Sequence, residues 1–163
     1  AASHIAEKSL VEFTDEVLRK HNITANCLRY EITESALIDD GERARFVMEQ
    51  LSKLGVKIAL DDFGTGFSSL SYLRQFPVDI VKIDRTFVMG IAESNADRAI
   101  ITATIALAKA LNMECIAEGV ETSNEEKYLN SLMCHYIQGY LYHKPMPIDA
   151  LQALLKHQIP SSQ

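Results

Sequence analysis

The sequence lacks several features that would assign it to a specialised class of protein. Its three cysteines form no Cys-x-x-Cys pair, its five histidines show no metal-ligand spacing, and no run of about 18 residues is uninterruptedly apolar. A disulfide scaffold, a zinc site and a membrane-spanning segment are therefore disfavoured, and reduced, buried thiols are expected. The start shows no signal pattern, which favours the cytoplasm, while an anchor elsewhere in a longer protein would not be visible.

Basic residues are also in short supply. Sixteen Lys and Arg face 22 Asp and Glu, giving a net charge of −6, so the surface as a whole repels a long nucleic acid. A small phosphate ligand is compatible with this charge if clustered carboxylates bind divalent metal ions, which then supply the positive field. No Pro/Ser-rich linker divides the 163 residues, which indicates one domain.

Short apolar runs alternate with amphipathic patterns along the chain. The apolar runs predict buried strands at 27–32, 56–60, 80–83, 113–117 and 135–137. The amphipathic patterns predict helices at 5–19, 41–54, 69–75, 96–111, 123–132 and 148–156. This order favours a parallel sheet with right-handed crossovers.

A doubly wound sheet and a (β/α)8 barrel both satisfy this order. No glycine fingerprint for a dinucleotide follows the first strand, whereas polar residues end every strand and would converge on one face of a barrel. A complete barrel usually needs about 250 residues. The expected fold is therefore α/β, a partial TIM-like (β/α)8 barrel of about five βα units with a leading helix.

The sharpest motif is the segment 61–70, Asp-Asp-Phe-Gly-Thr-Gly-Phe-Ser-Ser-Leu. An apolar strand delivers Asp61 and Asp62, and two glycines let the backbone turn beside a ligand. The two acids could hold two metal ions. Alternatively, the acids and Ser68-Ser69 merely cap the helix that follows.

Other strand ends carry acids as well. Period two places Glu31 and Thr33 on one strand face, while Glu34 lies beyond it and either fastens a loop or caps a turn. Glu118 ends the fourth strand, and such an end rarely uses an acid for packing. Glu121 follows two residues after Gly119.

Lys82 interrupts the third apolar strand, and Asp84 follows two positions on, which predicts the same face. A buried charged pair requires matching, so it is a structural salt bridge or a functional group. Gln138 at the last strand end is a ligand contact or part of a plain turn. Oxygen donors of this kind suit magnesium or manganese, which points to phosphate-ester chemistry.

Five segments in order resemble the EAL-domain cyclic-di-GMP phosphodiesterases: 30–35, 59–70, 81–85, 117–122 and 138–140. The resemblance implies a modified TIM barrel that uses two magnesium or manganese ions to hydrolyse cyclic di-GMP to linear pGpG. It implies that Glu31, Asp61 and Asp62 bind metal, with Asp61 bridging the ions. By the same resemblance Lys82 binds and polarises the attacking water, and Glu118 is a second-metal ligand or the general base.

Further residues match the family's active-site face: Asp84, Glu121 and Gln138. Glu34 resembles the anchor of the loop from Asp62 to Leu70. The segments 63–74 and 85–98 resemble the dimerisation region and predict a homodimer. The apolar residues of the segment 85–98 include Phe87, Val88, Met89 and Ile91.

The chain also departs from the family. The Glu-Ala-Leu segment has no counterpart here, and the Asn-x-Ser ligand segment belongs just before residue 1, with residues 1–5 resembling its tail. Residues 1–163 are therefore expected to be the C-terminal part of a single EAL domain, inactive alone. The alternatives are a catalytically inactive module that binds cyclic di-GMP or mediates dimerisation, and a barrel fragment with a purely structural role.

Overall fold

The computed structural model describes residues 8–34, 41–64 and 70–158. A single parallel sheet forms its centre, with the strands in the order in which they occur along the chain. They are β1 (Arg29–Thr33), β2 (Lys57–Phe63), β3 (Ile80–Ile83), β4 (Glu114–Ala117) and β5 (Tyr136–Ile137). A doubly wound sheet reverses its strand order at a switch point, so this order is that of a TIM-like barrel.

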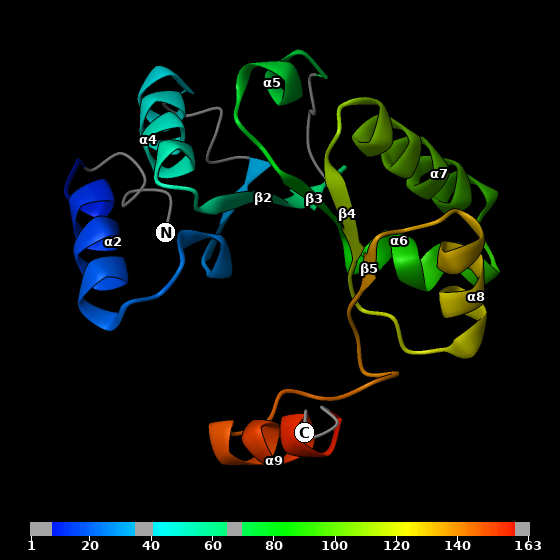
Figure 1. Cartoon of the computed structure of the whole chain (residues 1–163). Coiled ribbons are helices and arrows are strands. Elements are labelled where there is room, and N and C mark those ends of the chain that lie inside the picture. Colours follow the sequence, from blue (N-terminus) through cyan, green and yellow to red (C-terminus); the bar gives the residue numbers. More distant parts are fainter. Residues whose placement is uncertain (1–7, 35–40, 65–69, 159–163) are drawn as a thin grey trace.

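Helices connect successive strands and cover the outer side of the sheet. The described helices are α2 (Lys8–His21), α4 (Gly41–Lys53), α5 (Leu70–Gln75), α6 (Arg85–Met89), α7 (Asn95–Ala110), α8 (Ser123–Ser131) and α9 (Ile148–Gln158), with 3-10 turns η1 (Ala25–Cys27) and η2 (Gly90–Ala92). In Figure 1, α4, α5, α7 and α8 surround the sheet, whereas α9 lies apart on the opposite side. The expected partial TIM-like barrel of five βα units is confirmed.

The two faces of the sheet pack against different hydrophobic clusters. The outer face carries β2 and β3 residues such as Leu60 and Val81, which join the main core. Helix α4 contributes four buried residues at helical spacing: Ala44, Val47, Met48 and Leu51. On the inner face a separate small cluster contains Ala59, Ile80 and Ile116. The inner face is therefore apolar in the middle of the sheet, and the charged side chains lie beyond it, toward the C-terminal ends of the strands.

Three local features differ from the sequence-based expectation. Strand β2 continues through Asp61 and Asp62 to Phe63, although the apolar run ends at Leu60. Helix α6 was not expected, because its five residues are too few to show a helical period. Cys27, expected to be buried, is exposed in η1. The expected beginnings of the first and third helices, at residues 5 and 69, lie outside the described residues.

None of the helices described within residues 8–34, 41–64 and 70–158 is long and apolar enough to cross a bilayer.

Gly119 follows β4 with a φ of +72°, and a Cβ atom there would collide with the Cβ of Arg85 at the start of α6. Gly55 has a φ of +90°, but a Cβ atom there would lie 3.4 Å from Ala25, an ordinary contact. We expect Gly55→Ala to reduce the free energy of unfolding by about 1 kcal/mol because of its left-handed backbone. Gly119→Ala should reduce the free energy of unfolding by a further amount of about 1–3 kcal/mol, because its new Cβ atom would also collide with the Arg85 side chain. Urea unfolding measures both, and equal losses would contradict the close approach.

Candidate active site

Lys82 lies at the centre of a cluster of three carboxylates. Its side chain projects from β3 and the residue is only 4% exposed. The Nζ atom is 2.8 Å from Glu31 Oε2, 3.0 Å from Asp61 Oδ1 and 2.9 Å from Glu118 Oε1. These acids belong to β1, β2 and the residue after β4. Four consecutive strands of the sheet therefore meet at one ammonium group.

Strand register explains this convergence. Glu31 pairs with Ala59, and Thr33 pairs with Asp61, so β1 and β2 present alternate residues to the same inner face. Lys82 pairs with Ile116, and Glu118 follows two residues after Ile116 on that face. Because all four strands are parallel, their polar side chains gather at one end of the sheet.

The cluster keeps Lys82 charged. Burial by itself lowers the pKa of a lysine, because the charged form loses its water. Hydrogen bonds from the ammonium to Glu31, Glu118 and Asp61 outweigh burial and raise the pKa of Lys82 well above its ordinary value of 10.5. At neutral pH this side chain is therefore a fixed hydrogen-bond donor and not a proton acceptor.

Asp62 points differently from Asp61 because the backbone changes conformation between them. The register of β2 against β3 shifts between Leu60 and Phe63, and Asp62 has a φ of +55°. The Asp62 amide donates to Asp61 Oδ1 at 3.1 Å. Burial, and then the negative charges of Asp61 and Asp84, raise the pKa of Asp62. The adjacent carboxylates thus have separate environments, and strained backbone at such a position is typical of functional sites.

Asp84 is not one of the three acids that form ion pairs with Lys82. Strand β3 ends at Ile83, and Asp84 is instead the N-cap of α6, accepting a hydrogen bond of 2.8 Å from the Thr86 amide. Burial opposes ionisation of Asp84, but the hydroxyl and amide of Thr86 outweigh it and lower the pKa of Asp84. The side chain of Asp84 contacts Asp62, so Asp84 interacts directly with the Asp62 carboxylate and not with the Lys82 ammonium.

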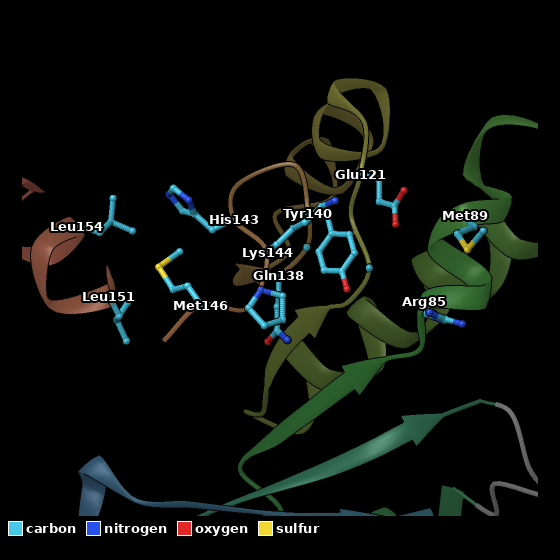
Figure 2. A pocket seen from close by; sticks show the side chains of 13 residues that line it. Arg85, Met89, Glu121, Gln138, Tyr140, His143, Lys144, Met146, Leu151 and Leu154 are labelled. Carbon is cyan, nitrogen blue, oxygen red and sulfur yellow. The ribbon is translucent and has the colours of Figure 1, made fainter. Parts of the chain in front are cut away.

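Glu121 and Gln138 lie in a neighbouring cavity of about 470 Å³. Figure 2 shows their side chains on one side of it, with Met146, Leu151 and Leu154 on the other. The sequence argument did not single out two basic residues that also line it, Arg85 and Lys144. Arg85 directly follows Asp84 at a strand end, and this position was the available signal.

Some predicted features cannot be placed. Glu34 follows β1 and is half-buried. The loop that it was expected to anchor includes residues 65–69, which lie outside the described part of the chain, as do the helix-capping Ser68-Ser69 and the segment 1–5. The role of Glu34 as an anchor therefore stays a prediction.

The donor chemistry of the cluster fits a hard divalent cation. Carboxylate oxygens of Glu31, Asp61 and Glu118 already surround one positive charge, the Lys82 ammonium, within 3.0 Å. Oxygen ligands of this type are those that magnesium and manganese prefer. With the carboxylates held by Lys82, the described residues contain no group of three or more acids, histidines or cysteines in metal-binding geometry.

Replacing Lys82 tests how strongly the cluster depends on it. We expect Lys82→Met to reduce the free energy of unfolding by about 2 kcal/mol at pH 7, because three partly exposed carboxylates lose their shared, buried counter-ion and repel one another. Lys57→Met removes the exposed Lys57–Asp79 pair of 2.7 Å and should cost less than about 1 kcal/mol.

The pH dependence follows from the raised pKa of Lys82. Its stabilising contribution is complete below 10.5, the ordinary value, and is lost as the pH rises through the folded-state pKa. The difference between the native chain and Lys82→Met should therefore begin to shrink above pH 10.5. Urea unfolding from pH 7 upward measures it, and a difference no larger than that of Lys57→Met would contradict the proposed role of the lysine.

Comparison with known proteins relates this geometry to a family. The family model described as "EAL domain" matches residues 1–145. Cyclic di-GMP phosphodiesterase NbdA of Pseudomonas aeruginosa is 41% identical over 155 residues, covering 95% of this chain and 20% of NbdA. The solved complex of the PaMucR phosphodiesterase with c-di-GMP superposes with a TM-score of 0.88 at 40% identity, covering 93% of this chain and 61% of the solved PaMucR chain.

A third similar protein is BlrP1 of Klebsiella pneumoniae, solved as a manganese and cyclic-di-GMP complex. It superposes with a TM-score of 0.80 at 32% identity, covering 85% of this chain and 36% of that one. The chain thus spans about a fifth of NbdA and about three-fifths of the solved PaMucR chain. Since the family model covers most of its residues, the chain belongs to the EAL domain family.

Proposed function

We propose that the protein containing this chain is a phosphodiesterase that hydrolyses cyclic di-GMP to linear pGpG with two divalent metal ions. The convergence of Glu31, Asp61 and Glu118 on Lys82 carries the proposal. A parallel sheet that places three acids and one lysine at the same end of its strands has the donors needed to bind metal and orient water. Similarity to the phosphodiesterases NbdA and PaMucR supports this substrate.

The metal-binding residues in this proposal are Glu31, Asp61, Asp62 and Glu118. Asp61 Oδ1 lies 3.0 Å from Lys82 Nζ and accepts a hydrogen bond from the Asp62 amide, which supports the bridging role that the family resemblance implies for Asp61. Bound divalent ions would lower the pKa of water and stabilise charge on a phosphate. The manganese in the BlrP1 complex supports manganese, and the donor chemistry suits magnesium equally.

Lys82 and Glu118 have different roles toward the attacking water in this mechanism. The raised pKa of Lys82 keeps its ammonium protonated, so it donates hydrogen bonds that hold and polarise the attacking water. A proton from that water must then move to a carboxylate. Glu118, 2.9 Å from Lys82, acts as that general base or as a metal ligand.

The neighbouring cavity accommodates the substrate in this proposal. Glu121 and Gln138 offer hydrogen-bonding groups for a base or ribose, and Arg85 offers positive charge for a phosphate. The side chain of Lys144 lies over the ring of Tyr140, with Nζ 5.5 Å from the ring centroid, so this wall combines charge with an aromatic face. Such a combination suits a dinucleotide, which has anionic phosphates and flat bases.

Residues 1–163 form, in our proposal, the C-terminal part of one EAL domain. Their alignment covers 93% of this chain but only 61% of the solved PaMucR chain. By resemblance, the Glu-Ala-Leu and Asn-x-Ser ligands of the first ion lie outside this chain. Glu31 and Asp61 alone would hold that ion loosely, and a small misplacement at such a centre can lower the rate about 100-fold.

Activity is the direct test of the proposal. We expect a complete EAL domain containing this chain to form pGpG from cyclic di-GMP with manganese, and the 163-residue chain alone to form almost none. In the complete domain, Asp61→Asn should lower kcat by about 100-fold or more, since the metal loses a charged ligand. Asp15→Asn on α2 makes the same charge change in an exposed helical pair and should leave kcat unchanged.

Two outcomes would contradict this account. Turnover by the 163-residue chain comparable to that of the complete domain would make the missing-ligand argument wrong. Tight binding of cyclic di-GMP by the complete domain without hydrolysis would instead favour the alternative, a binding module that has lost catalysis.

We also propose homodimerisation through the region that includes α6. Within this region Val88 and Ile91 are buried in the chain's own core, so they are unavailable to a partner, contrary to the sequence-based expectation. Met89 remains 62% exposed and Phe87 half-buried.

Substituting the exposed methionine tests this interface. Met89→Glu should shift the mass measured by sedimentation equilibrium toward the monomer, because a charge replaces an exposed apolar contact. Phe46→Glu is the control, since Phe46 on α4 is similarly exposed, at 56%, outside this region. A strictly monomeric native chain at high concentration, or equal effects of the two substitutions, would contradict the proposal.

A further inference from the structure

Two cysteines lie together at the opposite end of β4 from Glu118. Cys115 belongs to β4 and is fully buried, whereas Cys134 lies between α8 and β5 and is half-buried. The Cys134 Sγ atom lies 3.6 Å from the main-chain oxygen of Cys115 and 3.4 Å from that of Tyr136. The third cysteine, Cys27, is exposed in η1.

The strand register and the core packing bring these residues close together. Ile116 pairs with Tyr136 across β4 and β5, so Cys115 lies beside His135, which directly follows Cys134. Cys134 packs against the core cluster that contains Cys115, so both side chains lie on the same side of the sheet. Neighbouring parallel strands, about 4.8 Å apart, are within the Cα–Cα range that disulfides span. Met133, with a φ of +57°, turns the chain back toward β4 immediately before Cys134.

The two thiols are also chemically unequal. Interaction with the Cys115 thiol lowers the pKa of Cys134, whereas interaction with Cys134 and burial raise the pKa of Cys115. Burial opposes the lowering at Cys134, while backbone groups of Tyr136, Ala117 and His135 add to it. The positive charge of Lys109, whose Nζ donates to the Leu132 oxygen at 2.9 Å, opposes the raising of the Cys115 pKa without reversing it. Cys134 is also the more exposed of the two thiols, so it is the one that we expect an oxidant to reach and react with first.

We propose that Cys134 and Cys115 form a thiol oxidation site that reacts with hydrogen peroxide and closes a reversible disulfide between β4 and the α8–β5 connection. This inference is independent of the proposed phosphodiesterase activity, because neither thiol belongs to the Lys82 cluster.

The reaction balances in two steps. The Cys134 thiolate attacks one peroxide oxygen, the O–O bond breaks, and the departing hydroxide takes a proton to become water, leaving a sulfenic acid. The Cys115 sulfur then attacks the Cys134 sulfur. Its proton and the sulfenic hydroxyl leave as a second water, and the S–S bond forms. Peroxide is reduced, both thiols are oxidised, and an external dithiol restores them.

Peptide mapping by mass spectrometry tests this site on the complete chain. After treatment with one equivalent of hydrogen peroxide, we expect two of the three thiols to disappear and one linked peptide to join Cys115 to Cys134, with loss of two hydrogen atoms. Dithiothreitol should reverse the change. Cys27→Ser should give the same linked peptide, because the exposed cysteine takes no part.

Two further variants separate the roles of the thiols. In Cys134→Ser, we expect the oxidation rate of Cys115 to fall about tenfold or more, because a buried thiol with a raised pKa is a poor nucleophile. In Cys115→Ser, the sulfenic acid on Cys134 should persist and be trapped by dimedone. Should the Cys115 variant fail to fold, the peptide map of the native chain still decides.

Three results would overturn the proposal: both thiols staying free under peroxide, conversion of Cys134 to sulfinic acid with Cys115 still reduced, or linkage chiefly through Cys27.

Discussion

The charge of Lys82 is the constraint on which the site depends. A lysine in the middle of a buried strand loses most of its hydration, and the sheet can tolerate it only if opposite charges meet it. Three carboxylates from three other segments do so within 3.0 Å. Strand order, register and side-chain direction must all be correct for that meeting to occur. The same constraint therefore fixes both the local fold and the position of the acids.

Lys82 lies between an apolar part and an acidic part of the inner face. Below the charged level the inner face is closed by Ala59, Ile80 and Ile116, which limit the access of water to Lys82 from beneath. Above it, Asp62 and Asp84 form a second acidic group, with Asp84 held by Thr86. The change of backbone conformation at Asp62 is what separates the two groups. In the proposed mechanism, these two acidic groups would hold the two cations.

The sequence was informative wherever a residue obeyed the periodicity of its element. Alternation and apolar runs were enough for the five strands, and the charged residue within the third strand was enough to single out Lys82. Periodicity failed where strands ended. Nothing local indicated that β3 stops at Ile83, or that Asp84 caps a short helix and contacts Asp62.

The partners of Lys82 were also beyond the reach of local patterns. Glu31 and Glu118 are 51 and 36 positions away in the numbering, and only the strand order brings them together. The cavity beside Gln138 combines residues from several connections, including the segment before α9, so no single motif describes it. Arg85 and Lys144 were missed for that reason.

The central claim is that this carboxylate cluster is where a divalent cation binds. Paramagnetic broadening of amide NMR signals by small additions of manganese tests it most directly, since it detects even weak binding. The account predicts that signals of Glu31, Asp61, Lys82 and Glu118 broaden first, while those on α2 and α9 persist. Uniform broadening, or broadening that begins at exposed acids of the helices, would contradict it.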